Sequence, residues 1–179
     1  MNLNIPNLIS LLRIFFIAPI LILLNFEVAH TTYFALIIFL LASLTDFLDG
    51  YVARKTDSET SLGALLDLIA DKLFISIILI YLLTFFTTLF YLIPVLLIVS
   101  REMSILAVRQ HYAEKQLKAK TVPSQLGKFK TFSQIIAISV LILSTAHPEY
   151  TIISISILWV SAIIGIYSFF DYITRWKRY

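Results

Sequence analysis

Long apolar stretches alternate with short polar connections along this chain. Six stretches of about 20 mostly apolar residues are each long enough to cross a hydrocarbon core about 30 Å thick. They cover roughly residues 7–26, 31–53, 62–85, 89–110, 126–146 and 151–174. Because most connections are short, the pattern predicts an all-α integral membrane protein, in which one bundle of six transmembrane helices occupies residues 1–179 as a single domain.

The first apolar stretch is predicted to be a retained helix and not a signal peptide. No Lys or Arg precedes it, Arg13 interrupts it, and no small-residue cleavage site follows it. Pro6 suits the first turn of a helix, where its missing N–H costs nothing.

The composition agrees with a membrane location. Hydrophobic residues make up 59% of the 179 residues and charged residues 14%, whereas about a quarter of a soluble domain is charged. The absence of cysteine excludes disulfides and thiolate metal ligands. The net charge of +3 indicates attraction to anionic lipid headgroups, and nucleic acid is not an expected partner because no soluble basic surface is predicted.

The distribution of basic residues predicts the orientation in the membrane. Lys and Arg lie in the connection after the second stretch, in the polar segment between the fourth and fifth, and in the tail, but the other connections contain none. Since cytoplasmic loops carry the excess of Lys and Arg, we expect both termini on the cytoplasmic side. Within the polar segment 111–128, a solvated loop is expected to hold Lys115, Lys118 and Lys120.

Four aspartates lie in the second and third apolar stretches, where a charged side chain is costly and is usually functional: Asp46, Asp49, Asp67 and Asp71. With their neighbours they form the pattern D-x2-D-G-x2-A-R-x8-G-x3-D-x3-D. Eight fixed positions at residue frequencies of about 6% have odds on the order of 10⁻¹⁰ in a random window. Chance does not explain this pattern.

The spacing places the aspartates on two helix faces. In the second stretch, two aspartates, a glycine and Ala53 fall at i, i+3, i+4 and i+7; in the third, Gly63 and the other two aspartates fall at i, i+4 and i+8. We expect the two faces to enclose one site that opens to the cytoplasm. Gly50 and Gly63 would leave room there for a phosphate and metal ions, although small residues in membrane helices more often permit close packing.

Carboxylates that converge in lipid need a cationic partner, and oxygen ligands suit hard divalent ions. We expect two Mg²⁺ ions, with Mn²⁺ as an alternative, because two ions about 3.5–4 Å apart activate an attacking oxygen and stabilise a leaving oxygen on phosphorus. Asp46 and Asp67 are the natural bridging pair. Asp71 is the expected proton acceptor, and Arg54 would pair with a diphosphate.

A second basic group lies at the expected cytoplasmic ends of the fourth and fifth stretches. Guanidinium and ammonium groups make charge-assisted hydrogen bonds to phosphate oxygens, so this group is predicted to bind a phosphate on a second substrate. Its members are Arg101, Arg109, Lys128 and Lys130. Glu102 is expected to offset part of the charge of Arg101 inside the bilayer.

Two other interpretations stay open at this point. The aspartates would stabilise the bundle by pairing with Arg54, Lys72 and Arg101, or they would line a proton or cation pathway in a metal-dependent transporter. Neither interpretation accounts for the two glycines, and the sequence has no inverted repeat that would support transport.

The stretch from Asp46 to Asp71 resembles, without a gap, the signature of the CDP-alcohol phosphatidyltransferases, membrane enzymes that transfer a phosphatidyl group from a CDP-linked donor to an alcohol. The resemblance implies six transmembrane helices, a homodimer and two metal ions. It implies that all four motif aspartates bind metal and that Asp71 also accepts a proton. Contacts to the donor CDP-diacylglycerol would fall on Asn7, Ser10, Gly50, Arg54 and Thr60.

Shorter matches resemble one bacterial branch of that family, the phosphatidylglycerophosphate synthases. They lie at residues 4–13, 44–54, 70–72, 101–102 and 126–131. Members of this branch join CDP-diacylglycerol to sn-glycerol 3-phosphate and release CMP, and the resemblance implies that reaction. A dianionic acceptor agrees with the four basic residues. The nearest alternative is the same chemistry with another acceptor, such as inositol phosphate.

Overall fold

The chain folds into a bundle of long helices. In this computed structural model the described residues are 5–26, 28–56, 61–114 and 125–176, and side chains are described for 11–26, 28–45, 65–108, 110 and 129–174. The α-helices are α1 (Ile5–Asn25), α2 (Ala29–Thr56), α3 (Ser61–Tyr81), α4 (Leu89–Glu114), α5 (Gln125–Ser144) and α6 (Thr151–Trp176). Two short 3₁₀ helices are η1 (Leu82–Thr84) and η2 (Pro148–Tyr150). All regular structure in these residues is helical, which confirms the all-α prediction.

Each predicted apolar stretch corresponds to one α-helix, and Pro6 lies in the first turn of α1 as expected. The expected loop over residues 111–128 is wrong at both ends, because α4 continues to Glu114 and α5 begins at Gln125. The residues at these ends include Ala, Glu, Gln, Leu and Lys, which favour helix, so a helix can continue beyond its apolar part.

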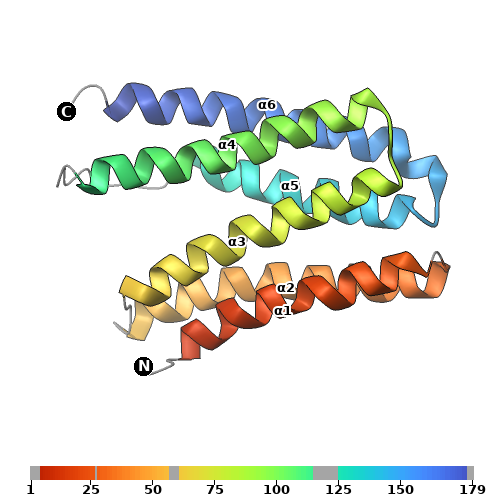
Figure 1. Cartoon of the computed structure of the whole chain (residues 1–179), viewed down its shortest axis with the longest axis horizontal. Coiled ribbons are helices and arrows are strands. Elements are labelled where there is room, and N and C mark those ends of the chain that lie inside the picture. The colour runs from red at the N-terminus through yellow and green to blue at the C-terminus, as the bar shows by residue number, and fades with distance from the viewer. Residues whose placement is uncertain (1–4, 27, 57–60, 115–124, 177–179) are drawn as a thin grey trace.

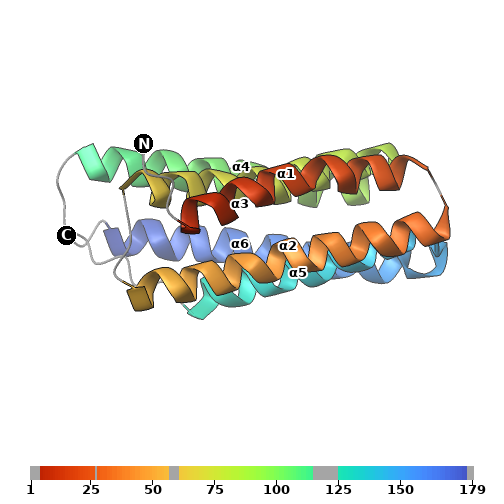
Figure 2. The same cartoon turned by 90° about the horizontal axis from the view of Figure 1, so that it is seen from below.

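The helices form two layers. Figure 2 shows α1, α3 and α4 in one layer and α2, α5 and α6 in the other. Helix α1 packs on both α2 and α3, α5 packs on α2 and α6, and α4 packs on α6. We call the end of the bundle where α1 begins the proximal end and the opposite end the distal end. Helices α2, α4 and α6 finish at the proximal end, and α3 and α5 begin there (Figure 1).

An apolar core runs along the bundle between the layers. The rings of Phe39 in α2 and Phe74 in α3 are stacked, with centroids 5.4 Å apart and an interplanar angle of 6°. The buried hydroxyl of Tyr91 donates a hydrogen bond of 2.7 Å to the carbonyl oxygen of Leu79, so it keeps a partner inside the core.

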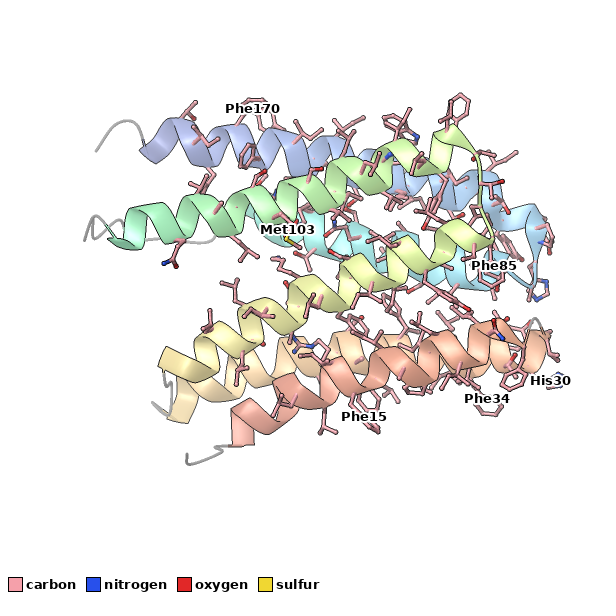
Figure 3. The ribbon with its side chains drawn as sticks, in the orientation of Figure 1. Phe15, His30, Phe34, Phe85, Met103 and Phe170 are labelled. Carbon is pink, nitrogen blue, oxygen red and sulfur yellow. The ribbon has the colours of Figure 1, made fainter. Side chains whose placement is uncertain are left out.

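The outer surface is also rich in apolar side chains. Phe15, Phe34 and Phe170 are 71%, 59% and 60% exposed, and Figure 3 shows them on the outside of the bundle. Apolar surface of this extent indicates contact with lipid or with another chain. Among the described residues, Leu89–Val108 and Pro148–Thr174 are long and apolar enough to be candidate membrane spans. The helices of the predicted bundle are thus confirmed, and six spans stay a prediction.

Candidate active site

The order of the helices brings both halves of the aspartate motif toward the proximal end. Asp46 and Asp49 belong to the C-terminal half of α2, and Asp67 and Asp71 to the N-terminal half of α3. Helix α2 finishes and α3 begins at this end of the bundle (Figure 1). The side chains of Asp46 and Asp49 lie outside the described part, so their role as metal ligands stays a prediction.

Asp67 is held by an arginine from another helix. Nη1 of Arg13, in α1, donates a hydrogen bond to Oδ1 of Asp67 over 3.3 Å. The Arg13 side chain is 1% exposed, whereas that of Asp67 is 47% exposed. A guanidinium is tolerated at such depth when its charge is paired and hydrogen-bonded. The pair connects α1 to α3 and orients a carboxylate that keeps an accessible face.

Asp71 contacts a lysine that also reaches a second carboxylate. Nζ of Lys72 lies 2.9 Å from Oδ2 of Asp71 and 2.6 Å from Oε2 of Glu102 in α4. Lys72 therefore bridges α3 and α4. It connects the predicted proton acceptor to a carboxylate that is buried between the helices.

Glu102 lies at the centre of a group of cations that we call the basic cluster, which consists of Lys72, Arg101 and Lys130. Oε1 of Glu102 accepts hydrogen bonds from Nη1 of Arg101, at 2.8 Å, and from Nζ of Lys130. Its other oxygen faces Lys72. The Glu102 side chain is 3% exposed, so these charge-assisted contacts offset the loss of its hydration.

Helix α6 completes the surroundings of the basic cluster. Nε of Arg101 donates to the carbonyl oxygen of Gly165 over 3.2 Å, and Nη2 donates to Oγ of Ser168 over 3.4 Å. Lys72 comes from α3, Arg101 from α4 and Lys130 from α5, and with these α6 contacts the cluster links four helices. Its geometry therefore depends on how α3, α4, α5 and α6 pack together.

Two of the four basic residues predicted to bind an acceptor phosphate meet in this cluster. Arg101 and Lys130 share one oxygen of Glu102, and the expected offset of the Arg101 charge by Glu102 is confirmed. Of the pairings expected if the aspartates only stabilise the bundle, the Asp71 contact with Lys72 is present. Within the described side chains, the carboxylate that Arg101 pairs with is Glu102 and not a motif aspartate.

The other predicted site residues have no described side chains, but several are placed by their helices. Those in helices lie toward the proximal end, at the start of α1 and α5 and in the last turns of α2 and α4: Asn7, Ser10, Gly50, Arg54, Arg109 and Lys128. Thr60 and the loop lysines Lys115, Lys118 and Lys120 lie outside the described residues altogether.

The described part of the site contains carboxylate oxygens, the type of ligand that a hard divalent ion prefers. Asp67 and Asp71 are one turn apart on α3, and both carboxylates are partly accessible. Carboxylate oxygens fit Mg²⁺ or Mn²⁺ better than softer ions. Among the described side chains no group of three acidic or imidazole groups gathers, and the side chains of Asp46 and Asp49 are not among them.

Three residues of the site were not assigned to it from the sequence: Arg13, Lys72 and Glu102. Each is a charged residue within an apolar stretch, and that signal identifies functional positions in membrane helices. The sequence does not predict which residues they pair with, because most of the contacts come from other helices and depend on how the bundle packs.

Comparison with known proteins agrees with the pattern of the site. The family described as CDP-alcohol phosphatidyltransferase matches residues 3–167, which include α1 to α5 and most of α6. The relative from Rickettsia felis is 36% identical over 179 residues, covering 98% of this chain and 97% of the relative. The relative from Haemophilus influenzae is 33% identical over 173 residues, covering 97% and 93%.

A third relative, from Shigella flexneri, is 29% identical over 175 residues, covering 97% of this chain and 95% of the relative. All three relatives carry the name CDP-diacylglycerol--glycerol-3-phosphate 3-phosphatidyltransferase. The family match extends over nearly the whole chain, and it includes both halves of the aspartate motif. This chain belongs to the CDP-alcohol phosphatidyltransferase family.

Proposed function

We propose that this chain transfers the phosphatidyl group of CDP-diacylglycerol to sn-glycerol 3-phosphate, giving phosphatidylglycerophosphate and CMP. The observation that carries this function is the similarity over nearly the full length to relatives named for that activity. The site supports it, because Lys72 joins the last motif aspartate, Asp71, to a group of cations suited to a phosphate.

The four motif aspartates would hold two Mg²⁺ ions, with Mn²⁺ as an alternative: Asp46, Asp49, Asp67 and Asp71. The partly accessible carboxylates of Asp67 and Asp71 support this assignment. When bound, the two ions supply charge stabilisation to the attacking and leaving oxygens on phosphorus. Arg13 would keep the Asp67 carboxylate oriented toward the site from its buried position in α1.

Asp71 would accept the proton of the 1-hydroxyl group of glycerol 3-phosphate. The oxygen then forms a bond to the phosphorus that carries diacylglycerol. The bond from this phosphorus to the CMP oxygen breaks, and its electron pair leaves with CMP. Lys72 holds the Asp71 carboxylate in position through the 2.9 Å contact.

The two substrates would occupy different parts of the proximal half. Contacts to the CDP part of the donor are assigned to Asn7, Ser10, Gly50, Arg54 and Thr60, with Arg54 pairing with the diphosphate. Contacts to the acceptor phosphate are assigned to Arg101, Arg109, Lys128 and Lys130. The meeting of Arg101 and Lys130 at one carboxylate supports the second assignment.

We further propose a multipass protein with six transmembrane helices, both termini and the active site at the cytoplasmic face of the cell membrane, and a homodimeric state. Basic residues flank the helices at the proximal end, which agrees with a cytoplasmic location of that end. The donor carries two acyl chains, so an active site at the membrane face lets the lipid react without leaving the bilayer.

An acceptor panel tests the reaction. Purified full-length protein in detergent and lipid would receive CDP-diacylglycerol and Mg²⁺ with glycerol 3-phosphate, inositol phosphate, inositol, serine or no acceptor. We expect CMP release only when glycerol 3-phosphate is the acceptor, with a phosphatidylglycerophosphate product that mass spectrometry identifies. Faster turnover with inositol phosphate would replace the proposed acceptor, and absence of CMP release with every acceptor would contradict transferase activity.

A further inference from the structure

The charge of the basic cluster is not balanced by its central carboxylate. Lys72, Arg101 and Lys130 bring three positive charges to Glu102, which brings one negative charge. Asp71 also contacts Lys72, but it belongs to the aspartate motif. With both carboxylates counted, the group still carries an excess of one positive charge.

Stability alone does not explain this arrangement. A buried ion pair can often be replaced by apolar side chains of similar volume without loss of stability, and uncompensated buried cations are destabilising. The side chains of Lys130 and Glu102 are nevertheless only 5% and 3% exposed. A buried excess of cations in a membrane protein indicates a functional role with an anionic partner.

Glu102 limits the repulsion that would otherwise separate the three cations. One oxygen of Glu102 accepts hydrogen bonds from Arg101 and Lys130, and the other oxygen faces Lys72. An ammonium group has three N–H donors and a guanidinium has five. The contacts to Glu102 use only part of this capacity, so the same cations can bind a second anion.

We propose that Glu102 is a positioning residue for the acceptor: it gathers Lys72, Arg101 and Lys130 into one site whose excess of positive charge complements the phosphate of the acceptor. This inference rests on the proposed function, because it takes a phosphorylated alcohol as the acceptor. Glu102 acts through the three cations and does not touch the substrate. It therefore sets the preference for a phosphorylated over an uncharged acceptor.

The test compares Glu102→Gln, which removes the charge, with Glu102→Asp, which keeps the charge and shortens the side chain. Full-length variants in detergent and lipid would be assayed with Mg²⁺ while both substrates are varied. The matched control is Glu149→Gln, the same chemical change at an exposed carboxylate in η2 that pairs with His147. Inhibition by inorganic phosphate gives a second measure of the same anion site.

We expect Glu102→Gln to raise the KM for glycerol 3-phosphate about ten- to a hundredfold, the range for loss of a charge-assisted contact. Glu102→Asp should raise it about threefold or more, because the shorter carboxylate cannot reach all three cations. The KM for CDP-diacylglycerol should stay within about twofold in both variants, and inhibition by inorganic phosphate should weaken in parallel with acceptor binding. Glu149→Gln should match the wild type.

An acceptor KM within about twofold of the wild type in Glu102→Asp would overturn the inference, and so would equal changes in both Michaelis constants. Glu102→Asp decides the matter even if Glu102→Gln does not fold. If the wild type releases no CMP with glycerol 3-phosphate, the proposed function fails separately. Thermal unfolding of the wild type and of Glu102→Asp, with and without inorganic phosphate, then still tests the anion site. Equal protection of both proteins by phosphate would overturn the inference.

Discussion

The distal and proximal halves of the bundle are held together by different kinds of polar contact. In the distal half the contacts between helices include neutral hydrogen bonds, such as the 2.8 Å bond from Nε1 of Trp159 to the carbonyl oxygen of Phe90. The hydroxyl of Tyr33 lies 2.7 Å from Nε2 of His147. In the proximal half the described contacts between helices include several ion pairs, and the group around Glu102 carries more positive than negative charge.

This difference separates residues that hold the fold from residues that prepare the site. A neutral hydrogen bond contributes about 0.5–1.5 kcal/mol and requires little burial of charge. Buried ion pairs often cost more in lost hydration than their attraction returns. The expensive contacts are concentrated near the aspartate motif, so function rather than stability accounts for them. Substitutions in the proximal half should therefore lower activity more than stability, and substitutions in the distal half should lower stability more than activity.

The largest effect is expected from Asp67→Asn, which keeps the shape of the side chain but removes the charge that would hold a divalent ion. Turnover should fall about a thousandfold or more, since several kcal/mol of charge stabilisation would be lost and each 1.4 kcal/mol is tenfold in rate. The protein should still insert into the membrane. CMP release at saturating Mg²⁺ measures the effect.

The matched control for that variant is Asp171→Asn in α6, which changes an aspartate outside the motif. It should retain most of the activity. Near-normal turnover of Asp67→Asn at saturating Mg²⁺ would contradict the assignment of two metal ions to the motif.

A smaller effect is expected from removal of one cation assigned to the acceptor phosphate, for example Arg109→Ala or Lys128→Ala. Charge-assisted contacts contribute about 1.5–3 kcal/mol each, which corresponds to a rise of about ten- to a hundredfold in the acceptor KM. The KM for CDP-diacylglycerol should change little. Lys115→Ala, at a lysine assigned to the solvated loop, is the control, and a loss at Lys115 as large as at Arg109 would contradict the pocket.

The sequence predicted the helices better than their contacts. Six helices follow from six apolar stretches, because length and apolarity are local properties of the chain. The end of α4 at Glu114 differs from the prediction, because the polar character of this segment indicates a loop whereas Ala113 and Glu114 favour helix. The spacing of the motif correctly indicated that Asp67 and Asp71 lie one turn apart on one helix, and their role as metal ligands stays a prediction.

The partners of these aspartates required the structure. Arg13 is 54 positions away from Asp67, and Lys130 is 28 positions away from Glu102. Contacts of this kind depend on which helix faces turn toward one another. A single sequence gives the charge of such residues but not the charge that they face, so Glu102 could be interpreted only as a neighbour of Arg101.

An intermediate effect is expected from Arg13→Met, which replaces the buried guanidinium by a shorter apolar side chain of similar volume. Groups that orient metal ligands usually contribute about ten- to a hundredfold to metal affinity or activity. Because Asp67 is nearly half exposed, we expect the lower end, with about a tenfold higher Mg²⁺ concentration for half-maximal activity. A Mg²⁺ titration measures it, and Arg13→Lys, which keeps the charge, should lose less.

The smallest effect on activity is expected in the distal half, from Tyr33→Phe, which removes the hydroxyl that contacts His147. The contact is exposed, so the free energy of unfolding should fall by less than about 1 kcal/mol. Thermal unfolding in detergent measures this change, and Tyr167→Phe, which removes an exposed hydroxyl from α6, is the control. Both Michaelis constants and the turnover should match the wild type, because this contact lies at the opposite end of the bundle from the aspartate motif. A loss of turnover in Tyr33→Phe as large as in Arg13→Met would mean that the two halves act as one unit, and that the neutral contacts also serve the site.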